Sequence, residues 1–198
     1  MIPVGITGGI GSGKSYVARL LAQNYRVPIY DSDSRARSLM IQPELRRQIE
    51  ALVGLEAYNQ DGSLNREVVA SYLFAAPEHA AAIDSIVHPA VKVDFTKWAG
   101  SQSAPIVLLE SAILVEAQFL DVVDSVIVVE APLNLRLERA MRRDQSSREK
   151  VLARMRHQLT DDDRRAYASV VVVNDGRPIM PQLRFFMAEK LAQSQGKA

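Results

Sequence analysis

The stretch GITGGIGSGKSY, residues 5–16, decides the fold of this protein. It contains five glycines from Gly5 to Gly13, followed directly by Lys14 and Ser15. Residues 8–15 match the phosphate-loop pattern G-x-x-x-x-G-K-[ST] at every specified position. Because glycine has no Cβ, a ligand can approach the main chain of such a loop closely. The apolar run before the loop (2–7) and the helical periodicity after it (15–24) predict a strand, a phosphate-binding loop and a helix in that order.

A loop of this kind binds the phosphates of a nucleoside triphosphate through its main-chain N–H groups and the N-terminus of the following helix. We expect Lys14 to reach the β- and γ-phosphates and the Ser15 hydroxyl to hold Mg²⁺. Tyr16 is expected to contribute its main-chain N–H. The predicted nucleotide-binding residues are therefore Gly8, Gly9, Ile10, Gly11, Ser12, Gly13, Lys14, Ser15 and Tyr16.

Two other classes of nucleotide-binding protein open with a similar loop. A dinucleotide-binding turn needs G-x-G-x-x-G. If that pattern starts at Gly9, Lys14 falls on the position of the third glycine, where a lysine has no role. A regulatory GTPase, by resemblance to that class, also carries D-x-x-G and [NT]-K-x-D. The sequence has no D-x-x-G, and its nearest match to the second motif, residues 96–99, lacks the final acid. Both classes are therefore disfavoured.

Four further apolar segments, at 27–33, 105–115, 124–132 and 168–176, predict strands of the same sheet. Their continuous apolar character is typical of parallel strands buried on both faces, which indicates an α/β protein. Residues 36–100 contain helix formers and no clear strand, so they predict a helical insertion. The expected organisation is a nucleotide-binding core at 1–35 and 101–198 with an insertion at 36–100. Residues 192–198 are expected to form a frayed tail.

Composition limits the partners of this protein. The 198 residues include 24 Lys and Arg and 23 Asp and Glu, and this net charge of +1 does not favour nucleic acid or an anionic membrane surface. The absence of cysteine excludes disulfides, thiolate metal sites and thiol nucleophiles. No apolar run approaches the length that spans a bilayer. We expect a cytoplasmic monomer or small homo-oligomer that binds neither nucleic acid nor membrane.

Asp31 and Asp33 follow the second predicted strand, and ligands of a doubly wound sheet gather at the carboxyl ends of its strands. One of these acids can accept the proton of a hydroxyl group that receives a phosphoryl group. Two other interpretations stay open, because the acids can also cap a helix that begins near Ser34 or form a D-x-D metal pair.

Nine arginines lie from Arg136 to Arg165. Arg139 and Arg143 are one helical turn apart, so both can face the same phosphate groups. We expect these two to belong to a mobile lid at about 138–165 that excludes water and stabilises charge during transfer. The other arginines are expected to face solvent. Residues 146–149, SSRE, predict a capping box that begins a helix at Ser146.

Seven segments resemble, in order and spacing, the dephospho-CoA kinases. They are GITGGIGSGKS (5–15), DSDSRAR (31–37), IVHPAV (86–91), AILVE (112–116), RAMRRD (139–144), RMRHQ (154–158) and VVNDG (172–176). The resemblance implies a three-layer α/β/α core with a five-stranded parallel sheet, a helical CoA-binding domain and a lid. It also implies transfer of the γ-phosphoryl group of ATP to the 3′-hydroxyl of the ribose of dephospho-CoA, the last step of coenzyme A synthesis.

Carried over residue by residue, the resemblance implies that residues 8–16 form the ATP site and that Asp33 is the proton acceptor. Arg139 and Arg143 become lid contacts, and together with Asp33 and Lys14 they are the expected catalytic residues. Asn174 and Gly176 lie where the adenine-side loop of the family runs.

His88 falls in the segment that resembles the CoA-binding region, so it is a candidate for substrate contact, although a histidine before proline also caps turns. The chain departs from the family pattern at Tyr16, where threonine is common, and at Ala112, where proline is common. Glu110 ends the third predicted strand, where it either orders Mg²⁺ through water or has a packing or capping role.

Three functions remain open at this point. A dephospho-CoA kinase is favoured, followed by a P-loop kinase for another small hydroxyl-bearing metabolite or nucleotide, and then by a nucleotide-dependent binding module without transfer. An acid beside the acceptor separates the kinases from the binding module. Only the resemblance separates the two kinases, because the residues alone do not name the acceptor.

Overall fold

The computed structural model describes residues 1–196, and within them a parallel five-stranded sheet has the order β2-β3-β1-β4-β5. The strands are β1 (Ile2–Thr7), β2 (Ile29–Asp31), β3 (Ile106–Glu110), β4 (Ser125–Glu130) and β5 (Val170–Val173). Parallel pairing places the carboxyl ends of all five strands along one edge of the sheet. The parallel α/β fold expected from the apolar runs is therefore confirmed.

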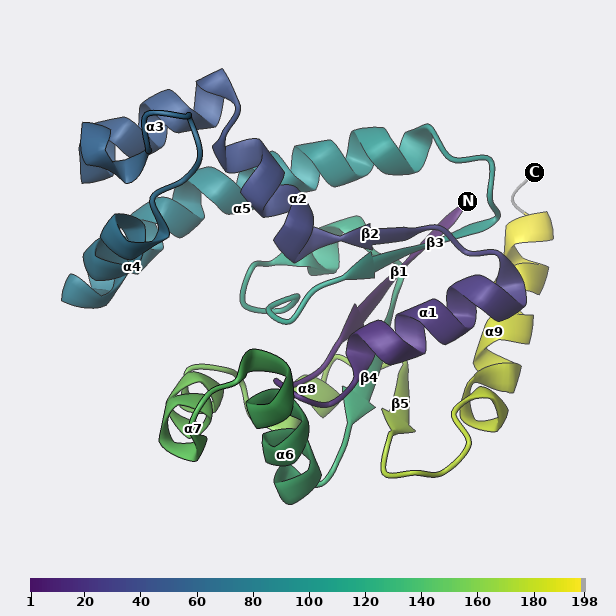
Figure 1. Cartoon of the computed structure of the whole chain (residues 1–198). Coiled ribbons are helices and arrows are strands. Elements are labelled where there is room, and N and C mark those ends of the chain that lie inside the picture. Colours follow the sequence, from purple (N-terminus) through teal and green to yellow (C-terminus); the bar gives the residue numbers. More distant parts are fainter. Residues whose placement is uncertain (197–198) are drawn as a thin grey trace. The chain divides into compact units, whose positions relative to one another are not determined.

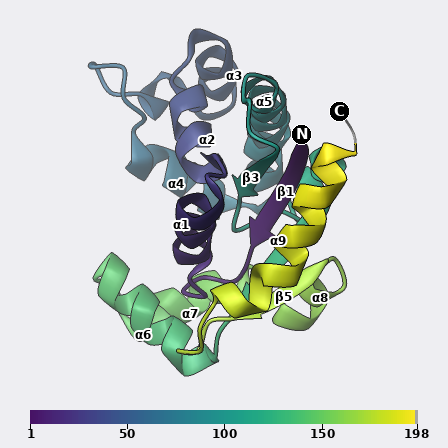
Figure 2. The same cartoon turned by 90° about the vertical axis from the view of Figure 1, so that its right-hand side faces the viewer.

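Helix α1 (Lys14–Tyr25) and helix α9 (Met180–Gln195) cover one face of this sheet (Figures 1 and 2). Val17 and Leu21 of α1 and Leu183 and Met187 of α9 are fully buried against strand residues in one apolar cluster. The opposite face packs on the segment after β3, which includes the short helix η2 (Phe119–Val122). The result is a three-layer α/β/α arrangement. The tail expected at 192–198 is instead helical to Gln195, and residues 197–198 lie outside the described residues.

The arginine-rich segment forms the three helices α6 (Leu133–Asp144), α7 (Arg148–Arg156) and α8 (Asp161–Arg165). Helices α6 and α7 share a small apolar cluster of Leu137, Ala140 and Val151. The capping prediction was wrong by one residue, because Ser147 rather than Ser146 caps α7. A full capping box instead begins α8, where Thr160 and Asp163 exchange hydrogen bonds.

Contacts divide the chain into two compact units, one of residues 1–31 with the described residues from 99 onward, and one of residues 32–98. The second unit is helical. Its elements are α2 (Ser32–Met40), α3 (Pro43–Val53), η1 (Leu55–Ala57), α4 (Arg66–Ala75) and α5 (Pro77–Gly100), the last of which continues into the first unit. Arg35 of α2 donates two hydrogen bonds to Asp94 of α5, each 2.8 Å long.

One local prediction in this region was wrong, and one alternative interpretation is excluded. The strand expected at 27–33 ends at Asp31, and α2 begins at Ser32, so Asp33 lies in the first turn of a helix. Asp31 therefore ends a strand and Asp33 belongs to a helix. The His88–Pro89 pair does not cap a turn, because both residues lie inside α5. Across residues 1–196, every helix is too short or too polar to cross a membrane.

Candidate functional site

The glycines of the phosphate loop are required by what packs around the loop. Gly11 and Gly13 have φ angles of +79° and +93°, which favour glycine. A Cβ on Gly11 would lie 2.1 Å from the main-chain oxygen of Arg136, and a Cβ on Gly13 would lie 2.1 Å from Nδ2 of Asn174. The loop therefore lies directly against α6 and against the residue that follows β5. The absence of side chains at these glycines therefore allows the loop to pack against its neighbours, as well as allowing a ligand to approach.

Asn174 and Arg139 both contact the loop region from distant parts of the chain. Asn174 is buried, and its Nδ2 donates a hydrogen bond to the main-chain oxygen of Ser12 over 2.8 Å. Arg139 of α6 donates from Nη1 to the main-chain oxygen of Asn174 over 3.0 Å. Arg139 therefore contacts the residue that contacts the phosphate loop. From this position its guanidinium can meet negative charge on a ligand.

Ser15 and Glu110 meet at the carboxyl edge of the sheet. The Ser15 hydroxyl at the start of α1 donates a hydrogen bond to Oε1 of Glu110, the last residue of β3. In the strand register Glu110 lies opposite Ile6 on one side and Asp31 on the other. A hydroxyl and two carboxylates are thus placed along the edge where a doubly wound sheet binds ligands.

Two buried hydroxyl groups at the loop have no hydrogen-bond partner within residues 1–196. They are Oγ1 of Thr7, the last residue of β1, and Oγ of Ser12 inside the loop. A buried hydroxyl without a partner costs free energy that a hydrogen bond to a ligand or to water removes.

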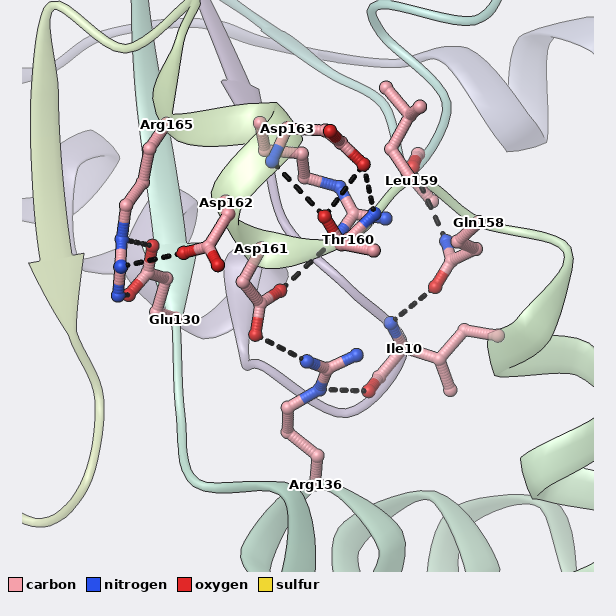
Figure 3. Close-up of polar contacts among 12 residues, drawn as sticks. Ile10, Glu130, Arg136, Gln158, Leu159, Thr160, Asp161, Asp162, Asp163 and Arg165 are labelled. Carbon is pink, nitrogen blue, oxygen red and sulfur yellow. Dashed lines mark hydrogen bonds and ion pairs between the residues drawn. The ribbon is translucent and has the colours of Figure 1, made fainter.

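Two arginines that the sequence placed in solvent are buried, so that expectation was wrong. Arg136 is 8% exposed and Arg164 is 1% exposed. Arg136 donates to the main-chain oxygen of Ile10 over 3.1 Å and pairs with Asp161 over 2.8 Å (Figure 3). Arg164 pairs with Asp161 over 3.2 Å, and burial lowers its pKa against the opposing effect of Glu116. Charge patterning along α6 and α8 did not reveal these contacts, because both helices carry exposed arginines too.

The comparisons with known proteins agree with this geometry. A family model described as dephospho-CoA kinase matches residues 2–179. A dephospho-CoA kinase of Bacteroides fragilis is 44% identical over 185 residues, which are 92% of this chain and 89% of that protein. A crystal structure of a Thermus thermophilus protein has a TM-score of 0.81 and 33% identity, with 97% of each chain covered. The chain belongs to the dephospho-CoA kinase family.

A dephospho-CoA kinase from Campylobacter jejuni shares the fold, with a TM-score of 0.63 at 18% identity over 99% of this chain and 98% of that one. The two departures from the dephospho-CoA kinase pattern have simple locations. Tyr16 lies in the first turn of α1 and its side chain is 48% exposed. Ala112 follows β3, and its main-chain oxygen accepts a hydrogen bond from Gln158. Neither position removes a side chain that the loop uses.

The remaining residues expected from the dephospho-CoA kinase resemblance lie farther from the loop or in the helical unit. Arg143 is exposed near the end of α6, where it pairs with Asp144 over 2.7 Å. Gly176 lies in the exposed turn after β5 with φ +109°. Asp33 is exposed in the first turn of α2. His88 is half-buried on α5, with Nε2 3.4 Å from Oδ1 of Asp84.

Proposed function

We propose that this chain transfers the γ-phosphoryl group of ATP to the 3′-hydroxyl of the ribose of dephospho-CoA, the last step of coenzyme A synthesis. Membership of the dephospho-CoA kinase family supports this reaction. The observation that carries the proposal is the phosphate loop between β1 and α1, with the Ser15–Glu110 pair and Arg139 at its edge. Catalysis of phosphoryl transfer depends mainly on positioning of the reactants and on stabilisation of charge, and these groups supply both.

The loop and Lys14 bind the triphosphate in this proposal. The first N–H groups of α1 have no partner inside the helix, so together with the helix dipole they favour a phosphate at this end. Lys14, the first residue of α1, adds a full positive charge. Its attraction to the transferred group strengthens as negative charge develops on that group. Asn174 and Gly176 are assigned to the adenine side of the nucleotide, and Asn174 also holds the loop through Ser12.

Mg²⁺ fits the oxygen pair at the strand edge. Mg²⁺ prefers oxygen ligands and commonly binds one or two protein oxygens together with phosphates and water. We assign Ser15 as the direct ligand and Glu110 as the acceptor that orients its hydroxyl or a bound water. When bound, the ion neutralises negative charge on the β- and γ-phosphates.

The acceptor side is assigned to the helical unit. We propose that Asp33 accepts the proton of the 3′-hydroxyl, since its carboxylate is exposed at the start of α2. A cavity of about 520 Å³ within this unit, lined by α2, α3 and α5, has a volume typical of small-molecule sites. His88 lies on α5 next to Pro89, and Pro89 lines that cavity. We assign His88 to substrate binding.

The segment at about 138–165 is assigned as a lid that carries Arg139 and Arg143. Its movement is assigned to the part around Arg143, since Gln158 already contacts the loop. Arg139 already contacts the main chain beside the loop, and it stabilises the charge that spreads over the transferred group. Arg143 must exchange its ion pair with Asp144 for the nucleotide when the lid closes. We also place the enzyme in the cytoplasm, as a monomer or small homo-oligomer.

One assay tests the reaction directly. The protein is incubated with Mg-ATP and dephospho-CoA, and the products are analysed by mass spectrometry for coenzyme A and ADP. Lys14→Ala serves as the inactive control, and its melting temperature is measured to show that it folds. Product from the wild-type protein and none from Lys14→Ala supports the proposal. ATP consumption without coenzyme A, or product formation only with another hydroxyl acceptor, contradicts it.

A further inference from the structure

Ile10, near the middle of the phosphate loop, contacts the arginine-rich segment through its main chain and its side chain, and Figure 3 shows the two main-chain contacts. Its main-chain N–H donates to Oε1 of Gln158 over 2.8 Å. Its main-chain oxygen accepts from Nε of Arg136 over 3.1 Å. Its side chain packs against the α6–α7 cluster of Leu137, Ala140 and Val151. One loop residue is therefore fixed by contacts that come from 126 and 148 positions away in the sequence.

Gln158 uses both ends of its side-chain amide. While Oε1 accepts from Ile10, Nε2 donates to the main-chain oxygen of Ala112 over 3.3 Å. Gln158 lies between α7 and α8, and Ala112 lies just after β3. The amide therefore joins the phosphate loop to the segment that follows the neighbouring strand. A side chain of the same length that cannot both donate and accept would lose at least one of these contacts.

Arg136 completes the contacts on the other side of Ile10. Its side chain is only 10% exposed, and Nη1 is held by Asp161, which also pairs with Arg164. A Cβ on Gly9 would lie 2.1 Å from Nη2 of Arg136, so the guanidinium lies directly against the loop main chain. A buried arginine with a fixed ion partner is a rigid support, because its guanidinium is planar and permanently charged.

The loop needs such support because glycine loses more conformational freedom on ordering than any other residue. A ligand that must order a loose loop binds more weakly, because the ordering cost is subtracted from the binding free energy. Contacts that order the loop before the ligand arrives remove this cost. Gln158 and Arg136 make such contacts, and they do so by holding Ile10.

We infer that Gln158 is a positioning residue that, together with Arg136, pre-orders the phosphate loop and so sets the affinity for nucleotide. This inference rests on the proposed nucleotide site. Gln158 acts through the main chain of Ile10 and not by contact with phosphate. Because coupling between two sites is reciprocal, nucleotide in the loop also stabilises the segment that carries Gln158.

Two variants of Gln158 test the inference against a matched control. Gln158→Met keeps the length of the side chain and removes both amide groups. Gln158→Glu keeps the acceptor for Ile10, loses the donor to Ala112 and brings negative charge near the triphosphate. Gln23→Met makes the same change at an exposed position of α1. Calorimetry measures the Kd for ATP, steady-state kinetics measure kcat and both KM values, and hydrogen exchange measures protection of residues 8–13.

The inference predicts that Gln158→Met raises Kd and KM for ATP about tenfold, the change expected for one or two net hydrogen bonds. Gln158→Glu raises them at least as much. The kcat at saturating ATP and the KM for dephospho-CoA stay within about twofold. Exchange at residues 8–13 becomes faster without nucleotide and returns towards the wild-type rate with ATP. Gln23→Met matches the wild-type protein in every measurement.

Two results overturn the inference. Unchanged Kd values in both Gln158 variants, or a lower melting temperature with unchanged Kd, would make Gln158 a residue of general stability. Equal losses in KM for ATP and for dephospho-CoA would also contradict a role confined to the loop. Failure of the wild-type protein itself to bind ATP is a separate result, which would overturn the proposed nucleotide site on which the inference rests.

Discussion

The side-chain amide of Asn174 donates a hydrogen bond to the main-chain oxygen of Ser12, with Nδ2 and O 2.8 Å apart. This contact joins the residue after β5 to the phosphate loop, 162 positions earlier in the sequence. Asn174 also accepts a hydrogen bond from Arg139 through its main-chain oxygen. One buried residue thus links the loop, the end of the sheet and the first lid arginine.

Asn174→Asp is expected to raise the KM for ATP by about tenfold or more, because it loses the donor to Ser12 and puts negative charge beside the triphosphate. Steady-state kinetics at varied ATP concentration measure the effect. Asn24→Asp is the matched control, since Asn24 is an exposed amide near the end of α1 that donates to Leu20. An unchanged KM in Asn174→Asp would show that this link does not support the nucleotide site.

Arg139→Met is expected to lower kcat by about ten- to a hundredfold and to change the Kd for ATP much less, because its charge is used mainly in the transition state. Arg143→Met is expected to act in the same direction, since we assign it to the closed lid. Arg142→Met, an exposed arginine on the same helix, serves as the control. Rapid-quench kinetics with calorimetry separate the two quantities. Weaker ATP binding at unchanged kcat would make Arg139 and Arg143 ordinary binding residues.

Asp33→Asn is expected to lower kcat by about a hundredfold or more, the usual scale for loss of a positioned base. The amide keeps the size of the side chain and suits a helix start, so the melting temperature and the affinity for ATP should barely move. Asp31→Asn is the internal comparison, because it makes the same change at the other acid of the pair, which ends β2. If Asp31→Asn abolishes transfer and Asp33→Asn stays active, the base is assigned to the wrong acid. If neither matters, the reaction uses no base from this pair.

Asp144 joins α6 to α7, because it accepts hydrogen bonds from Arg143 and from Arg154, each with a 2.7 Å contact. The Arg143 hydrogen bond, with a further contribution from Arg154, lowers the Asp144 pKa to about 2. A lowered pKa stabilises the fold above the unfolded value of 3.8, and this contribution is lost as pH falls towards 2.

Asp144→Asn is therefore expected to reduce the free energy of unfolding by about 1 kcal/mol at pH 5–8, a figure reduced for solvent screening of a partly exposed pair. The difference from the wild-type protein should shrink below pH 4. Denaturant titrations across this range measure it, and carbon-13 NMR of the Asp144 carboxyl group follows the pKa itself. A difference that is independent of pH would mean that the ion pairs contribute nothing.

The phosphate loop, the parallel sheet and the helical insertion could be predicted from the sequence because each depends on local pattern. The loop needs glycine at positions of positive φ and a lysine at fixed spacing, and both requirements appear directly as residue types at 8–15. The central strands are covered on both faces, so they appear as continuous apolar runs such as IVLL at 106–109. These are properties of short segments that do not depend on distant contacts.

The tertiary structure decided which polar side chains support the loop. Gln158 and Arg136 resemble their exposed neighbours in the sequence, and only the packing of α6 and α8 beside β4 and the loop brings them to Ile10. Asp33 was expected in a strand, but β2 is an edge strand that pairs with β3 alone, and its pairing ends at Asp31. Local pattern tells which residues can form a helix or a strand. The partner of a buried polar side chain is set by which elements meet across the fold, and that depends on contacts more than a hundred residues apart.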